Sequence, residues 1–160
     1  MSAKYGRFFA MIGTSTLVMF VLMYLNTYSV DHIFFSETRA FMALYMGGAM
    51  AVVMLAFMLN MYGDFKTNLA IFLGGILLFS LGVYLVRSQA TIGDEAWMKA
   101  MIPHHSIAIL TSERANLTDP RVKALAGEII KAQKVEIEEM KALIADLNGG
   151  PPATPEIDGR

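Results

Sequence analysis

The side chains best able to do chemistry in this sequence are methionines and histidines in a short segment of the C-terminal half. Met98, Met101, His104 and His105 follow one another on either side of Pro103. At about 100° per residue on a helix, Met98, Met101 and His105 fall within a sector of roughly 60°. His104 lies about 60° beyond Met101. Two thioethers and at least one imidazole are therefore expected on one helical face.

A second helical stretch repeats this spacing with Gln133, Glu136 and Met140. In an antiparallel hairpin that turns near residues 117–118, Met140 comes within a turn of Met98. We expect Gln133 and Glu136 to act as interface or supporting groups.

Two or three Met with one or two His form a soft ligand set. Such a set suits copper, and Cu(I) in particular, better than zinc, magnesium or calcium. The chain has no Cys, which excludes thiolate sites and disulfides, and no Glu-x-x-His pair of the ferritin-like di-iron type. The alternative is that Met98, Met101 and Met140 are flexible core residues and that both histidines face solvent at a kink.

These residues resemble the family catalogued as domain of unknown function family 305. The family pattern Met-Ile-Pro-His-His and Ala-Ile is found at residues 101–105 and 108–109, and its Asp-Pro to Met second half at residues 119–140. The resemblance covers about residues 94–147. It implies copper binding through Met101, His104, His105 and Met140 in an all-helical bundle. Leu110 stands where many members have a further Met.

The elements that position these residues follow from the distribution of charge. Residues 1–90 contain eight charged side chains, and the rest of the chain more than twice as many. Residues 8–30, 40–63 and 67–86 contain no charged side chain. Each is long enough to cross the roughly 30 Å hydrocarbon core as a helix. The first is too long for a cleaved signal peptide and is expected to remain as an anchor.

Beyond the apolar stretches, the sequence predicts a helical hairpin. Asp94 is expected to cap a helix that ends near residue 115, and Thr118 or Asp119 to cap a second one that begins at Pro120 and ends near Leu147. The predicted fold is all-α, with a three-helix transmembrane domain (1–90), a hairpin of ferritin-like or four-helix-bundle type (91–147) and a flexible tail (148–160). Because two short helices cannot close a core, we expect a homo-oligomer.

The second apolar stretch contains a ladder of methionines at every fourth position: Met42, Met46, Met50, Met54 and Met58. With Met19 and Met23 they could provide a path for a soft ion. Close helix packing is the favoured interpretation, because Gly47 and Gly48 lie on the same stretch. His32, in the loop between the first two apolar stretches, is expected to be an interface residue rather than a ligand.

The sequence therefore predicts a copper-binding protein anchored in the bacterial inner (plasma) membrane. Lys4, Arg7 and Lys66 favour an N-terminus inside, which leaves the hairpin on the outer, periplasmic side, where it would sequester or relay copper. The alternatives are a copper transporter or transporter subunit, and a helical scaffold that binds no metal. We expect no enzyme, because no Ser/His/Asp arrangement is visible, and no nucleic-acid partner, since the net charge is −1.

Overall fold

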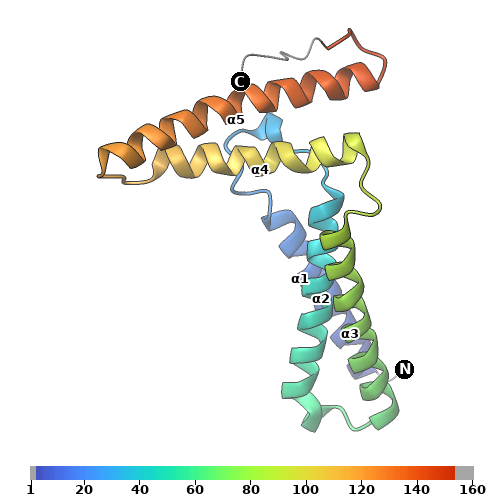
Figure 1. Cartoon of the computed structure of the whole chain (residues 1–160). Coiled ribbons are helices and arrows are strands. Elements are labelled where there is room, and N and C mark those ends of the chain that lie inside the picture. Colours follow the sequence, from blue (N-terminus) through green and yellow to red (C-terminus); the bar gives the residue numbers. More distant parts are fainter. Residues whose placement is uncertain (1–2, 154–160) are drawn as a thin grey trace. The chain divides into compact units, whose positions relative to one another are not determined.

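The computed structural model describes residues 3–153, and this part of the chain is all helical. The helices are α1 (Ala3–Leu22), α2 (Glu37–Met58), α3 (Phe65–Ser88), α4 (Asp94–Arg114) and α5 (Pro120–Leu147) (Figure 1). Two 3₁₀ turns, η1 (Val30–His32) and η2 (Leu59–Met61), lie in the first two connections. The predicted order, three long apolar helices followed by a two-helix hairpin, is confirmed.

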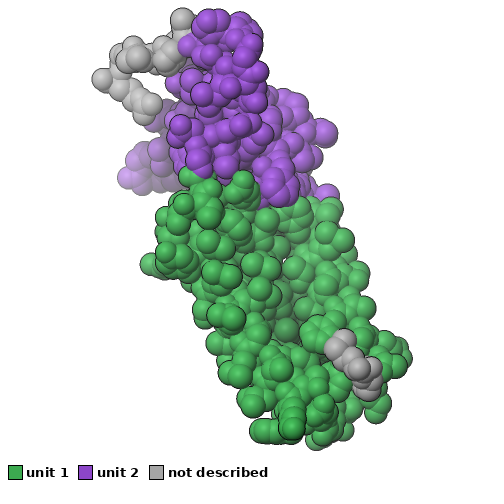
Figure 2. All heavy atoms as spheres, turned by 90° about the vertical axis from the view of Figure 1, so that its right-hand side faces the viewer, with its two compact units in different colours: residues 1–23, 37–92 green, residues 24–36, 93–160 purple. Residues whose placement is uncertain are grey.

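The helices group into two compact units that do not simply follow chain order. One unit contains α1 to Met23 and Glu37–Ile92, and the other contains Tyr24–Ser36 and the chain from Gly93 onward (Figure 2). The connection between α1 and α2 therefore belongs to the same unit as the C-terminal hairpin.

The first unit has the character of a multi-pass membrane protein. Its helical segments Ala3–Leu22, Glu37–Met61 and Phe65–Ser88 are each long and apolar enough to cross a bilayer. Large apolar side chains remain uncovered along these segments, with Phe57 87% exposed and Leu77 68% exposed. Helices satisfy their own backbone groups, so such a surface is suited to lipid.

Small residues let α2 and α3 approach closely. A Cβ added to Gly48 would lie 2.7 Å from the carbonyl oxygen of Gly75, and one on Gly82 would lie 3.1 Å from that of Phe41. This backbone contact is typical of packed transmembrane helices. Met54 and Met58 pack against an apolar core made by Tyr5, Phe8, Leu55, Tyr62 and Ile71. These contacts favour the packing interpretation of the methionine ladder.

Helices α4 and α5 pack through a second apolar core, formed by Met98, Ile102, Ile109, Ile137 and Met140. Helix α5 begins at Pro120, and the Asp119 carboxylate accepts a hydrogen bond from Arg121 N at 2.8 Å, as the cap prediction required. The predicted cap of α4 is wrong. Asp94 is already helical, and Gly93 precedes it without a side-chain bond.

The connection 24–36 lies against this hairpin. Tyr28 N donates to Ser106 Oγ at 2.7 Å, and Phe34 packs against the apolar core of the hairpin. The first apolar stretch was expected to stay helical to Val30, but α1 ends at Leu22. In the following segment the Tyr28 N–H donates to the Ser106 hydroxyl of the hairpin rather than to a helical carbonyl oxygen.

Helix α5 ends at a glycine turn. Gly149 has φ 82°, the left-handed conformation that glycine adopts at little cost, and Ala153 N donates to Asp146 Oδ2 at 3.0 Å. The flexible tail predicted for residues 148–160 extends past this turn, and its residues 154–160 lie outside the described part of the chain.

Candidate metal site

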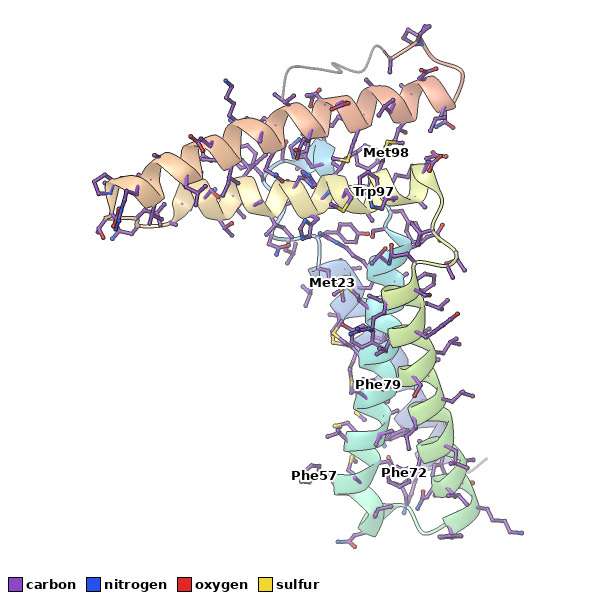
Figure 3. The ribbon with its side chains drawn as sticks, in the orientation of Figure 1. Met23, Phe57, Phe72, Phe79, Trp97 and Met98 are labelled. Atoms are coloured by element: carbon purple, nitrogen blue, oxygen red, sulfur yellow. The ribbon has the colours of Figure 1, made fainter. Side chains whose placement is uncertain are left out.

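Three of the predicted ligands are methionines that meet in the core of the hairpin. Met98 of α4 and Met140 of α5 are 5% and 6% exposed and belong to the same apolar cluster. Met101, one turn from Met98, is half-buried and packs against that cluster. Figure 3 shows the Met98 side chain between α4 and α5. The hairpin thus gathers three thioethers from two helices.

The His105 ring lies between its own helix and α5. Its Nδ1 is 2.9 Å from the carbonyl oxygen of Met101, and its Nε2 is 2.9 Å from Oε2 of Glu136. A carbonyl oxygen only accepts hydrogen bonds, so Nδ1 carries a proton. Metal-bound histidines are held by the same kind of bond from their other ring nitrogen. Nε2 is therefore the ring nitrogen that would bind a metal ion, in place of its contact with Glu136.

Glu136 and Gln133 support this ring from α5. The Gln133 side-chain amide donates to Glu136 Oε2 at 3.3 Å, and the same oxygen faces His105 Nε2. The carboxylate is therefore held beside the atom where a cation would bind, and its negative charge would favour that cation.

His104 is placed differently from the other candidates. It is exposed, and its ring centroid lies 6.1 Å from that of His105 with the planes 66° apart. Successive helical residues point about 100° apart, which turns His104 away from the methionine cluster. The structure therefore groups Met98, Met101, His105 and Met140 and leaves His104 at the edge.

A polar cluster that the sequence did not reveal links His32 to the hairpin. His32 Nδ1 lies 2.9 Å from Ser106 Oγ, and its Nε2 lies 3.6 Å from Asp31 Oδ2. Asp31 also pairs with Lys141 Nζ of α5 at 2.6 Å. Burial lowers the pKa of His32, and the hydrogen bond from Lys141 is the main cause that holds the pKa of Asp31 well below its usual range.

The polar cluster contains a Ser, a His and an Asp side chain, which no sequence pattern had placed together. Ser106, His32 and Asp31 come together, but Ser106 is 0% exposed and accepts the Tyr28 N–H as well. A hydroxyl in this position has no access to a substrate, so the cluster serves to hold the connection 24–36 on the hairpin. Since 74 residues separate His32 from Ser106, no local spacing could have indicated it.

Within residues 3–153, no three His, Asp or Glu side chains gather in a way that could hold a metal ion. The candidate site differs in kind, because three of its members are thioethers and one is an imidazole. Such a set belongs to soft-metal chemistry.

The fold and the site define a helical membrane protein with a C-terminal hairpin, and comparison with known proteins gives its family. Residues 85–155 match the domain of unknown function (DUF305). An uncharacterized protein of Acanthamoeba polyphaga mimivirus is 37% identical over 142 residues, which cover 84% of this chain and 91% of that protein. The chain belongs to the DUF305 family. No solved structure matches it.

Proposed function

We propose that this protein binds Cu(I) in its C-terminal hairpin and sequesters or relays it at the outer face of the bacterial inner membrane. The observation that carries the proposal is the meeting of Met98, Met101 and Met140 in one cluster. Thioethers hold Cu(I) well and bind hard cations weakly, and they avoid the thiol oxidation expected outside the cytoplasm. Copper is here the cargo, and no catalytic step is required of it.

Each ligand has a distinct part in the proposed site. Met101 and His105 lie at the half-buried edge, while Met98 and Met140 reach the site from the apolar interior. Binding through His105 Nε2 requires the Glu136 oxygen to move aside and remain nearby as a counter-charge. His104 is exposed beside this edge and would be the first side chain to meet an incoming ion.

The role is proposed as binding rather than catalysis or transport. Transport through the bilayer, the second candidate, depends on the methionine ladder of α2. Met54 and Met58 pack in an apolar core, and Gly48 of the same helix lies in close contact with α3. Flexible methionine side chains fill irregular gaps beside such a contact, so packing explains the ladder without an ion path. A scaffold without metal remains the third candidate, and it treats the hairpin methionines as packing.

Metal analysis of the full-length protein in detergent, combined with a Cu(I) chelator competition, tests the proposal. We expect one Cu(I) per hairpin, retained in the variant Met46→Leu/Met50→Leu, which removes two thioethers from the ladder alone. Loss of copper from that variant would favour the transporter. If the parent protein binds no Cu(I) even at the lowest chelator concentration, the scaffold without metal would be favoured.

A further inference from the structure

A groove lies between the beginning of α1 and the end of α2, within the membrane unit. Its volume is about 590 Å³, inside the roughly 300–1,000 Å³ range of small-molecule sites. The side chains that matter for its chemistry are Lys4, Arg7, Phe8, Met11, Met58 and Met61. None of the residues proposed to hold copper lines this groove.

One wall of the groove carries two positive charges. Lys4 and Arg7 are three residues apart on α1 and share a face of that helix, and both are exposed. Over residues 3–153, no carboxylate lies within ion-pair distance of either side chain. Both cations are therefore available to an anionic ligand.

The rest of the groove is apolar. Phe8 is 1% exposed and forms part of the core beneath, and Met11 and Met58 supply flexible walls. Because α1 and α2 are candidate membrane spans, these walls extend into the hydrocarbon region while Lys4 and Arg7 lie near its edge. A ligand that fits has an anionic head and an apolar tail.

A neighbouring pocket extends the polar end of the groove. Its volume is about 400 Å³, it shares Lys4, Met61 and Tyr62 with the groove, and it reaches Thr67. The one carboxylate there, Asp64, already accepts hydrogen bonds from Lys66 N at 3.1 Å and from the Thr67 hydroxyl at 2.5 Å. A headgroup thus has room beside the cations.

We propose that this groove binds one anionic phospholipid, with its phosphate on Lys4 and Arg7 and an acyl chain along Met11 and Met58. Three methionines line the groove, so Cu(I) is a second ligand to consider for it. Two unpaired cations repel a metal ion and attract a phosphate, so the charge favours the lipid.

Native mass spectrometry of the full-length protein tests this proposal by comparing retention of phosphatidylglycerol and phosphatidylcholine. We expect the parent protein to retain one phosphatidylglycerol preferentially. The variant Lys4→Gln/Arg7→Gln should lose roughly thirtyfold in that preference, since each of the two basic side chains contributes about 1 kcal/mol toward anionic lipid. Lys66→Gln is the matched control, because Lys66 is an exposed cation of the same unit that lines neither pocket.

Met58→Trp, which fills the apolar part, should reduce retention and leave both charges in place. Equal retention of the two lipids by the parent protein would overturn the proposal, and this measurement needs no variant to fold. An equal loss of the phosphatidylglycerol preference in Lys66→Gln would also overturn it. So would a result in which Cu(I) displaces phosphatidylglycerol from the parent protein but not from the variant Met11→Leu/Met61→Leu.

Discussion

The Nε2 atom of His105 lies 2.9 Å from Oε2 of Glu136, so a side chain of α4 that is proposed to bind copper is held by a carboxylate of α5. The same ring is fixed on its other side by the carbonyl oxygen of Met101. Both contacts hold the ring at the edge of the methionine cluster. The Met101 contact can persist when a metal binds Nε2, so it orients the ring beforehand and lowers the entropic cost of binding, whereas the Glu136 contact has to be given up.

The two histidines should contribute unequally to Cu(I) binding. His105→Ala should weaken it by at least tenfold, because it removes a nitrogen that the hairpin already orients. His104→Ala, the neighbouring exposed position, should weaken it only a few-fold. Competition titrations of both variants measure the difference, and a larger loss for His104→Ala would contradict this assignment of the ligands.

The His32 cluster predicts that the hairpin unit loses stability in mild acid. Burial lowers the pKa of His32 below its ordinary 6.5, so the folded protein binds this proton less readily than the unfolded chain. The stability that His32 contributes is therefore fully present above about pH 6.5 and is lost as the pH falls below that value, toward the lower pKa of the folded protein. Asp31, whose pKa is depressed, stays ionised there, and Lys141 and Glu138 are the other charges that act on His32.

Thermal unfolding at about pH 7.5 and pH 5 measures this effect. The variant His32→Gln can keep a hydrogen bond to Ser106 but cannot titrate, so its melting temperature should depend less on pH. An unchanged pH dependence in that variant would assign the effect to other groups.

The orientation in the membrane is predicted from Lys4, Arg7 and Lys66, which favour an N-terminus inside. With three spans, alkaline phosphatase fused after Leu147 should be active in a bacterial host. A fluorescent protein that matures only in the cytoplasm should stay dark at the same position, and its fluorescence there would reverse the orientation.

The hairpin is predicted to associate with a second copy. On α5, Val122 and Leu125 lie one turn apart and are 45% and 55% exposed, a surface that two hairpins could bury in a four-helix bundle. Mass measurement in detergent should give a dimer, and Val122→Glu/Leu125→Glu should give a monomer. A parent protein that stays monomeric at every concentration would contradict the prediction.

Local signals explain which parts of the fold the sequence predicts well. Helix α5 begins and ends where Asp119-Pro120 and Asn148-Gly149 predict, because caps and breakers act within a few residues. The end of α1 was not predictable in this way. Its following segment bonds through Tyr28 N to Ser106 Oγ, 78 residues away, and no local pattern records that contact.

In the candidate site, too, features set by local spacing were predictable and features set by contacts between distant residues were not. Helical spacing and an antiparallel turn sufficed to bring Met98 and Met140 together. His104 was predicted as a ligand as well, and the structure leaves it exposed at the edge of the cluster. The contact of His105 with Glu136 and the burial of His32 depend on rotamers and on the packing of three segments. These features require the tertiary structure.

The central claim is that the hairpin methionines bind Cu(I), and the variant Met101→Leu/Met140→Leu tests it most directly. Leucine keeps the volume and apolar character, so the free energy of unfolding should change by less than about 1.5 kcal/mol. In a chelator competition the variant should release Cu(I) at a chelator concentration at least tenfold lower than the parent requires. Release at the same concentration would mean that the thioethers only pack the core, and it would contradict the copper-binding account.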